Sequence, residues 1–328
     1  MCNGSAGIDM HLHTNKEIPV IVVPERLTVI EAVDFKEKGI EILSDASVPS
    51  SVVLDFSSTE FIDSSGIGAL VNLFKISQDN GVVLSFVRVG ATVKSVLSLT
   101  HLDQLFNIID DPKSSESEST FSVPQTHPSV NSRIKRFLDI IGSLLGLCIT
   151  GIVFIPIAIL IKVDSQGPIF FKQERCGWLG KRFKIIKFRS MCVNAESLKN
   201  TIVNEVSGPF FKNKNDSRIT RVGKFLRRTS LDELPQFWNV LKGDMSLVGT
   251  RPPTPDEVEK YGVPEWQRLN VKPGMTGQWQ VFGRSKVLSF EDVIKYDLDY
   301  QEKWSLGYDI ELIIRTILII FRKNNGAV

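Results

Sequence analysis

The sequence predicts two modules: an α/β domain with a small mixed sheet and flanking helices, followed by a mainly α-helical, membrane-associated domain. Three observations predict this division. Short apolar strands alternate with helical segments up to residue 111, the charge balance reverses near residue 132, and 22 uncharged residues follow at Ile140–Ile161. A chain of 328 residues suits two domains of ordinary size. We therefore expect domains at 1–111 and 133–328, joined by a linker at 112–132.

The charge distribution favours two modules with different partners. Residues 1–132 contain 8 basic and 17 acidic side chains, a net charge of −9, whereas the remainder contains 31 and 20, a net charge of +11. The basic half favours an anionic partner, such as lipid headgroups, a nucleotide-linked substrate or nucleic acid. The four cysteines lack metal-ligand spacing, so we expect reduced thiols. The first 13 residues do not predict a cleaved signal peptide.

The first module alternates strands with helices, the pattern of an α/β sheet. The expected strands are Asp9–His13, Ile18–Val23, Val52–Phe56 and Val82–Val87. The expected helices are Thr28–Ala46, Ile67–Ile76 and Thr92–Leu99. The segment that follows, Pro112–Ser132, is rich in serine, proline and acidic residues and has little to bury, which predicts a disordered or extended linker.

The uncharged stretch Ile140–Ile161 is long enough to cross a bilayer. Proline lacks the N–H of a helical hydrogen bond and crowds the preceding turn, so we expect a break at Pro156. Basic residues on both flanks favour two cytoplasmic ends: Arg133, Lys135 and Arg136 before the stretch and Lys162 after it. This pattern leaves open a re-entrant helix, a kinked spanning helix and a buried soluble helix.

A second apolar stretch, Ile310–Phe321, is too short to span a membrane and is interrupted by Glu311 and Arg315. It suits a helix that lies in the membrane interface. An ordinary core-packing helix has the same pattern.

A dense basic run precedes two adjacent acids, Asp232 and Glu233. A carboxylate can attack phosphorus to form an acyl phosphate, provided that cations offset the repulsion between the two anions. Mg²⁺ uses few protein carboxylates and takes its other ligands from phosphate and water, so the same pair suits this ion. The sequence therefore predicts a polyanion site with Mg²⁺ as cofactor. The cations of the run are Lys212, Lys214, Arg218, Arg221, Lys224, Arg227 and Arg228.

The acid pair and the basic run also have simpler structural interpretations. Ser230-x-x-Glu233 matches a capping box, in which the acids only neutralise a helix start. Pro235 is better placed in the first turn of a helix, and if the helix begins after Leu234, both acids lie outside it. Three of the cations recur at helical spacing and would share one solvated or lipid-contacting face: Arg221, Lys224 and Arg228.

Eight ordered blocks cover nearly the whole second module. They are Lys135-Arg-Phe-Leu-Asp139, Gly167-Pro-Ile-Phe-Phe-Lys-Gln-Glu-Arg175, Gly180-Lys-Arg-Phe-Lys184, Lys187-Phe-Arg-Ser-Met191, Arg218-Ile-Thr-Arg-Val-Gly223, Leu226-Arg-Arg-Thr-Ser-Leu-Asp-Glu-Leu-Pro-Gln236, Lys272-Pro-Gly-Met-Thr-Gly277 and Gln280-Val-Phe-Gly-Arg284. On these blocks the module resembles the bacterial sugar transferases, the monotopic phosphoglycosyl transferases. One departure is Gly249-Thr-Arg-Pro252, where many members have Gly-Pro-Arg-Pro.

The resemblance implies a mechanism. Asp232 would be the nucleophile that takes a sugar-1-phosphate from a UDP-sugar and releases UMP, and Glu233 would assist with Mg²⁺ or proton transfer. The phosphosugar would pass to a polyprenyl phosphate such as undecaprenyl phosphate, which would initiate an exopolysaccharide or another surface glycan. By the same resemblance, Arg227 would contact phosphate and Arg251-Pro252 would belong to the nucleotide-binding region. The other expected phosphate-binding side chains are Arg221, Arg228, Lys187 and Arg189.

The resemblance also implies a topology. The membrane segment, residues 137–163, would be a re-entrant helix broken near Pro156. The protein would sit in the inner membrane, in contact with lipids, with both domains facing the cytoplasm.

A second motif in the first module is Asp63-Ser-Ser-Gly66, at an expected helix start. Free N–H groups there would favour a phosphate, although plain capping by serine explains the same pattern. The stretch Val53–Leu70 resembles the anti-sigma-factor antagonist (STAS) domains. In those domains the second serine of this motif is the phosphorylated residue, which would be Ser65. The resemblance implies a regulatory or docking domain with a kinase or phosphatase partner.

Two rival functions fit parts of the sequence. A membrane-tethered STAS signalling scaffold with a non-catalytic transferase half would not need Asp232, Glu233 and Arg227 intact. A nucleic-acid binder would use the basic run, but the apolar segment and the lack of a recognisable reading motif argue against it, so we expect no nucleic-acid partner.

Overall fold

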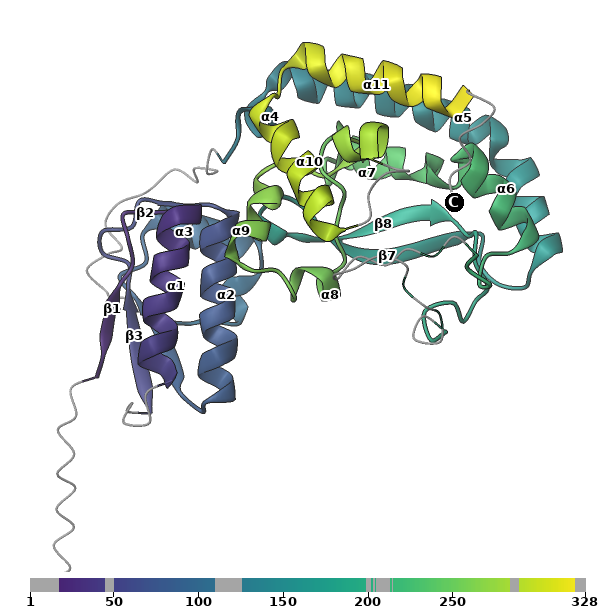
Figure 1. The fold of residues 1–328 in the computed structure, drawn as a ribbon. Coiled ribbons are helices and arrows are strands. Elements are labelled where there is room, and N and C mark those ends of the chain that lie inside the picture. The colour runs from purple at the N-terminus through teal and green to yellow at the C-terminus, as the bar shows by residue number, and fades with distance from the viewer. Residues whose placement is uncertain are drawn as a thin grey trace, which may run out of the picture.

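The computed structural model describes residues 18–44, 50–109, 126–198, 202, 204, 213, 215–283 and 289–321. The expected strand Asp9–His13, most of the linker, and Lys212 and Lys214 lie outside the described residues. Figure 1 shows an α/β domain beside a larger domain that is mainly helical.

The first domain is built on a four-stranded sheet in the order β1-β3-β5-β6, with three parallel pairings. Its strands are β1 (Val20–Val22), β3 (Ser51–Asp55), β5 (Val83–Val87) and β6 (Asn107–Ile109), and β2 (Arg26–Leu27) pairs in parallel with β4 (Phe61–Ile62). The helices are α1 (Val29–Ser44), α2 (Ser64–Asp79), α3 (Ala91–Leu99) and the 3-10 turn η1 (Leu102–Gln104). The α/β alternation is confirmed. A mixed sheet stays a prediction, because the first expected strand is not described.

Local capping explains where α2 begins. The Asp63 carboxylate accepts a hydrogen bond from the Gly66 N–H at 3.0 Å, and this N-cap starts the helix at Ser64, three residues before the expected Ile67.

The second domain joins helices to short strands. Its helices are α4 (Pro128–Asn131), α5 (Arg133–Asp164), α6 (Arg221–Thr229), α7 (Phe237–Lys242), α8 (Pro255–Val258), α9 (Val263–Trp266), α10 (Phe290–Glu302) and α11 (Leu306–Phe321). Shorter turns are η3 (Trp178–Gly180), η5 (Leu231–Gln236), η6 (Gln267–Asn270) and η7 (Trp279–Gly283). An antiparallel hairpin joins β7 (Phe170–Cys176) to β8 (Arg182–Phe188), and β9 (Ser246–Val248) pairs in parallel with β10 (Gly274–Thr276).

The apolar segment forms one continuous helix, α5, which does not end at Pro156 but continues to Asp164. The expected break in the helix is therefore wrong as an interruption of secondary structure. Figure 1 shows that α5 nevertheless changes direction: its first part lies behind α11, and its last part descends past α6. A change of direction fits a proline that removes a helical hydrogen bond while the flanking turns remain helical.

Among the described residues, α5 is the one helix long and apolar enough to cross a membrane by length and composition, and only 22% of its most apolar window is buried. A core helix of a soluble protein would be mostly buried. Apolar side chains also remain exposed along α11. Those of α5 are Ile134, Phe137, Ile141, Leu144, Leu145, Ile149, Ile152, Ile155, Ile159, Leu160 and Val163, and those of α11 are Ile310, Ile314, Ile317, Leu318 and Ile320.

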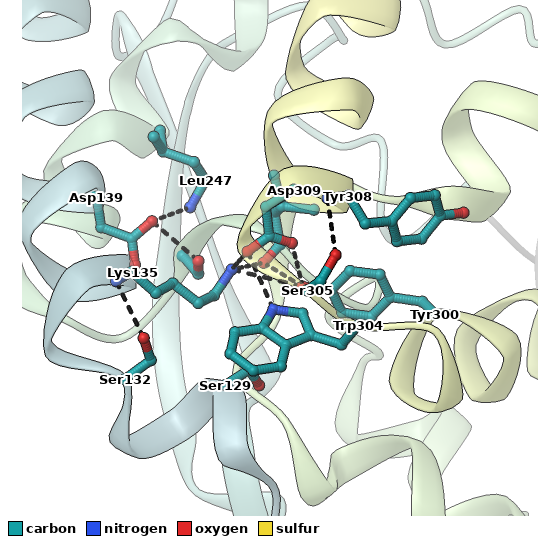
Figure 2. A network of polar contacts seen from close by, with 12 residues as sticks. Ser129, Ser132, Lys135, Asp139, Leu247, Tyr300, Trp304, Ser305, Tyr308 and Asp309 are labelled. Carbon is teal, nitrogen blue, oxygen red and sulfur yellow. Dashed lines mark hydrogen bonds and ion pairs between the residues drawn. The ribbon is translucent and has the colours of Figure 1, made fainter.

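Both ends of α5 are attached to the same body. At the first turn, Lys135 Nζ lies 2.5 Å from Asp309 Oδ2 on α11 and donates to Val248 O at 3.0 Å (Figure 2). One turn later, Asp139 Oδ1 accepts from the Leu247 N–H at 2.8 Å (Figure 2). At the far end, Asp164 Oδ2 accepts from the Val222 N–H at 3.1 Å.

The two domains share one apolar core. Helix α2 packs against α9, and the core side chains of both domains form a continuous cluster. The packing is tight at Gly68, where the three atoms nearest to an added Cβ would all belong to the Trp266 ring, at 2.5–2.8 Å. Only glycine fits this position without a shift of the tryptophan.

Candidate active site

The two acids lie in the 3-10 turn η5. Ser230 has a left-handed backbone with φ of 56°, and its side chain caps nothing, so the capping-box prediction is wrong. Helix α7 starts only at Phe237, and both acids therefore lie outside it, as the alternative prediction has it.

Helix α5 packs against this turn. Thr150 Oγ1 lies 3.4 Å from Leu234 O. The Phe237 ring packs so closely on Gly146 that a Cβ there would lie 2.4 Å from it. The position of the acid pair is therefore coupled to the apolar helix α5.

A cavity of about 400 Å³ opens beside the acid pair. Five cationic side chains line it: Arg175, Lys187, Arg218, Arg227 and Arg251. Other lining residues include Asp216, Glu233, Gln236, Pro252, Gly274, Met275, Thr276, Trp279 and Gln280, together with Thr316, Ile319 and Ile320 of α11. The cations suit a polyanion, and the isoleucines connect the cavity to the apolar helix.

The structure brings together most of the predicted site residues. Glu233, Lys187, Arg227, Arg251 and Pro252 all line the cavity. Asp232 is not among the lining side chains, but it lies in the same turn as Glu233 and is 7% exposed.

Three predicted phosphate-binding arginines lie elsewhere. Arg221 and Arg228 are exposed on α6 and do not line the cavity. Arg189 is buried and donates to Gln166 O and Ser165 O, both at 2.7 Å, so it caps the carbonyl end of α5. The phosphate-binding prediction is corrected for Arg189, because both of its terminal nitrogens are engaged there.

Burial raises the pKa of Asp232 to about 6, and the negative charge of Glu233 acts in the same direction. The cations of Lys187 and Arg227 oppose this rise in pKa. Asp232 is thus a poorly solvated carboxylate that is still ionised in most molecules at pH 7, as a nucleophile requires.

Each partner in this cluster has a defined place. Glu233 Oε1 accepts from Lys187 Nζ at 2.9 Å. Arg227 Nε donates to Ser190 Oγ at 3.0 Å, and burial lowers the pKa of its guanidinium. Both cations therefore lie where they can meet the charge of a bound phosphate.

The acid pair fits Mg²⁺ by the chemistry of its donors. Among the residues that the structure describes, no group of three or more His, Cys, Asp or Glu side chains could hold a metal. Mg²⁺ needs only one or two protein carboxylates when phosphate and water supply the rest. The Glu233 side chain, on the cavity wall and 35% exposed, meets this need with Asp232 beside it.

Arg175 and Asp216 were not singled out from the sequence, and Arg218 was named only as one cation of the basic run. Arg175 donates to Pro252 O at 2.8 Å, and Arg218 pairs with Asp216 at 2.6 Å. Arg175 and Arg218 stand at the edges of two of the blocks that carry the family resemblance, which is the signal that could have marked them.

Glu257 fixes the position of Arg251, which lines the cavity. Its two carboxylate oxygens accept from Arg251 Nη1 and Nη2 at 2.9 and 3.1 Å. Although burial alone would raise it, the pKa of Glu257 is lowered, chiefly by the charge and hydrogen bonds of Arg251. Arg251 is thus fixed at the cavity in the predicted nucleotide-binding region.

The candidate phosphorylation site, Ser65, is fully buried. Ser65 and Ser64 are both 0% exposed at the start of α2, and neither hydroxyl has a hydrogen-bond partner among the described residues. A kinase requires an exposed hydroxyl, so this conformation does not present Ser65 to one.

Known proteins match both domains. The bacterial sugar transferase family matches residues 130–323, and the STAS domain family matches residues 9–115. Galactosyl transferase CpsE of Streptococcus agalactiae is 50% identical over 188 residues, 57% of this chain and 42% of that protein. Undecaprenyl-phosphate galactose phosphotransferase of Salmonella typhimurium is 42% identical over 199 residues, which are 59% of this chain and 41% of that protein.

The exopolysaccharide production protein ExoY of Rhizobium meliloti is 34% identical over 218 residues, which are 61% of this chain and 92% of that protein. The chain spans about two fifths of the length of the Streptococcus and Salmonella relatives. The match to the transferase family covers more than half of the chain and includes the acid pair and every residue that lines the cavity. The chain belongs to the bacterial sugar transferase family and carries a STAS domain in front of the transferase domain.

Proposed function

We propose that the chain is a phosphoglycosyl transferase that moves a sugar-1-phosphate from a UDP-sugar to a polyprenyl phosphate such as undecaprenyl phosphate. The observation that carries the proposal is an acid pair beside a cavity lined by five cations and bordered by an apolar helix. Relatives named as undecaprenyl-phosphate sugar phosphotransferases support the reaction class. The product would initiate an exopolysaccharide or another surface glycan.

Asp232 acts as the nucleophile. Its carboxylate oxygen attacks the phosphorus that bears the sugar, the bond from that phosphorus to the bridging oxygen breaks, and UMP leaves with that oxygen. A phosphate oxygen of the polyprenyl phosphate then attacks the same phosphorus. The bond to Asp232 breaks, the carboxylate is restored, and a polyprenyl diphosphate sugar is formed.

The cations of the cavity offset the repulsion between carboxylate and diphosphate. Lys187 and Arg227 lie near enough to oppose the rise in the pKa of Asp232. When bound, Mg²⁺ would be held by Glu233, with Asp232 as a second candidate ligand, and would neutralise phosphate charge.

Helix α5 is proposed to be re-entrant, with the protein in the inner membrane and both domains in the cytoplasm. Its ends are fixed by Lys135 and Asp164 to one body, and a helix crossing the membrane would place them on opposite sides. The exposed apolar side chains of α11 suit a helix lying in the membrane interface.

A partner kinase or phosphatase could act on Ser65 only if the start of α2 opened to solvent. The hydroxyl is otherwise enclosed, and phosphate would add charge to a site with no room for solvent.

The reaction is tested by incubating membranes that contain the protein with a panel of UDP-sugars and undecaprenyl phosphate, and measuring UMP. The covalent step is tested with donor alone, by intact-protein mass spectrometry. The expected result is a mass increase of one phosphosugar on the wild type and none on Asp232→Asn. Turnover without that adduct, under conditions that trap an acyl phosphate, would contradict the covalent mechanism.

A further inference from the structure

Asn270, the last residue of η6, joins the two domains through both ends of its amide. Its Nδ2 donates to Asp63 Oδ2 at 3.2 Å, and its Oδ1 accepts from the Ser64 N–H at 2.9 Å. Its backbone oxygen accepts from Thr126 Oγ1 at 2.6 Å, just before α4. A single buried side chain therefore satisfies groups at the start of α2 and anchors the turn η6 to the first domain.

The turn η6 also supports Arg251, which lines the active-site cavity. Arg268, two residues earlier, is fully buried and donates to Arg251 O at 3.3 Å. It also donates to Tyr261 Oη at 2.7 Å and forms an ion pair with Asp297. Arg251 is thus held by Arg268 at its carbonyl and by Glu257 at its guanidinium.

The chain that leaves η6 forms another part of the wall. Strand β10 begins at Gly274, four residues after Asn270, and its three residues line the cavity. The Gly274 N–H donates to Thr250 O at 2.8 Å, so β10 is bonded directly to the residue before Arg251. A shift of η6 would move both parts of this wall together.

We propose that Asn270 is a positioning residue through which the STAS domain sets the affinity of the transferase cavity for the nucleotide part of its donor. This inference rests on the proposed function. The first domain serves as a fixed support for η6, and Arg268 and β10 transmit that support to the cavity wall. The acid pair in η5 lies outside this connection, so binding is expected to change while the chemical step is kept.

An exchange of two side chains tests the contact. Asn270→Asp places a carboxylate against Asp63 and is expected to raise the Kd for UMP and the KM for the UDP-sugar about five- to tenfold, with kcat within twofold of wild type. The double variant Asp63→Asn, Asn270→Asp restores one amide and one carboxylate in exchanged positions. Because asparagine also caps helices well, the double variant is expected to recover wild-type binding.

Two further variants complete the design. Asp79→Asn makes the same acid-to-amide change as Asp63→Asn, but at the opposite end of α2. It is expected to leave UMP binding unchanged. Gly68→Leu would force the Trp266 ring away and is expected to weaken UMP binding independently of any charge. Circular dichroism establishes that each variant is folded. Hydrogen exchange over residues 60–70 and 265–272 measures whether η6 has loosened, as is expected for Asn270→Asp and Gly68→Leu but not for Asp79→Asn or the double variant.

The outcomes separate the two proposals. Folded variants with loosened η6 but wild-type UMP affinity would overturn the positioning role alone, as would a folded double variant without recovery. Equal losses in kcat and in binding would indicate general destabilisation and also overturn it. A wild-type protein that neither binds UMP nor releases it from any UDP-sugar would instead refute the proposed function.

Discussion

Lys135 and Asp309 form a buried ion pair that joins the first turn of α5 to α11, with Nζ and Oδ2 2.5 Å apart (Figure 2). The Tyr300 hydroxyl donates to Asp309 Oδ1 at 2.8 Å, and Trp304 Nε1 donates to Oδ2 at 3.1 Å. Both charges are thus enclosed by polar partners at the point where the apolar helix leaves the body of the domain.

Lys135→Met is expected to lower the free energy of unfolding by about 3 kcal/mol, because it leaves the Asp309 carboxylate buried without its cation. Thermal unfolding in detergent measures this loss. Lys135→Met combined with Asp309→Leu is expected to recover more than half of it, since no charge is then left unpaired. Arg133→Met, an exposed residue in the same turn, is the matched control. A Lys135 variant as stable as that control would contradict the role of the pair.

Asp232→Asn is expected to abolish UMP release and to stabilise the protein. A folded-state pKa of about 6 against an ordinary value of 3.8 corresponds to roughly 3 kcal/mol of destabilisation when the carboxylate is ionised. The folded protein binds the proton more tightly, so this cost is absent below pH 4 and complete above pH 6. Denaturant unfolding at pH 4 and pH 8 should show a gain for the variant, up to about that size, only at the higher pH.

The activity of the wild type is expected to fall as the pH drops below about 6, since the ionised form of Asp232 is the nucleophile. The fall in kcat/KM should approach tenfold per pH unit. UMP release across pH 4.5 to 8 measures this profile. Constant activity down to pH 5 would argue against an Asp232 that titrates near pH 6.

Arg227→Ala and Arg228→Ala separate the cavity from the exposed face of α6. Arg227 lines the cavity, so its loss is expected to reduce kcat/KM about a hundredfold or more, as for other preorganised donors at a developing charge. Arg228 is exposed outside the cavity, and its loss is expected to stay within about twofold, as for a rim charge. The reverse order would mean that the phosphate binds on the outer face of the helix.

Ser65→Asp is expected to lower the free energy of unfolding by about 3 kcal/mol or more, because it buries an unpaired carboxylate. Ser65→Ala removes a hydroxyl that has no partner among the described residues and is expected to be nearly neutral. Thermal unfolding of the two variants measures the difference. Equal stability would show that solvent reaches the start of α2.

Single cysteines at Ser132 and Ser165, in a background without the native cysteines, test the topology of α5. Both are expected to react with a reagent supplied from the cytoplasmic side and to be protected from a membrane-impermeant reagent applied outside. Labelling of the two positions from opposite sides would exclude a re-entrant helix.

The sequence identified the groups that are adjacent along the chain and missed those that meet only in the fold. Asp232, Glu233 and Arg227 lie within seven residues and share a family pattern, so local reading finds them. Arg175 reaches the cavity from the β7–β8 hairpin, which the sequence did not predict. The residues of its two strands alternate only partly between buried and exposed. The apolar–polar alternation that would predict a strand from the sequence is therefore weak.

Arg189 shows the opposite error. The family resemblance placed it among the expected phosphate-binding side chains, but β8 ends at Phe188 and the Arg189 guanidinium donates to the end of α5 instead. The contact joins residues 23 and 24 positions apart around a bend that no local pattern specifies. The closed start of α2 was missed for a related reason, since the Ser64 N–H donates to Asn270, which lies 206 positions away in the sequence.

Helix α11 contributes Ile319 and Ile320 to the cavity, while Ile317 and Leu318 remain open to the surroundings. If the acceptor is a long prenyl phosphate, its hydrocarbon tail can stay dissolved in lipid while the headgroup slides along this helix into reach of the acids. Lateral diffusion in two dimensions, rather than extraction into water, would then govern how quickly each acceptor arrives.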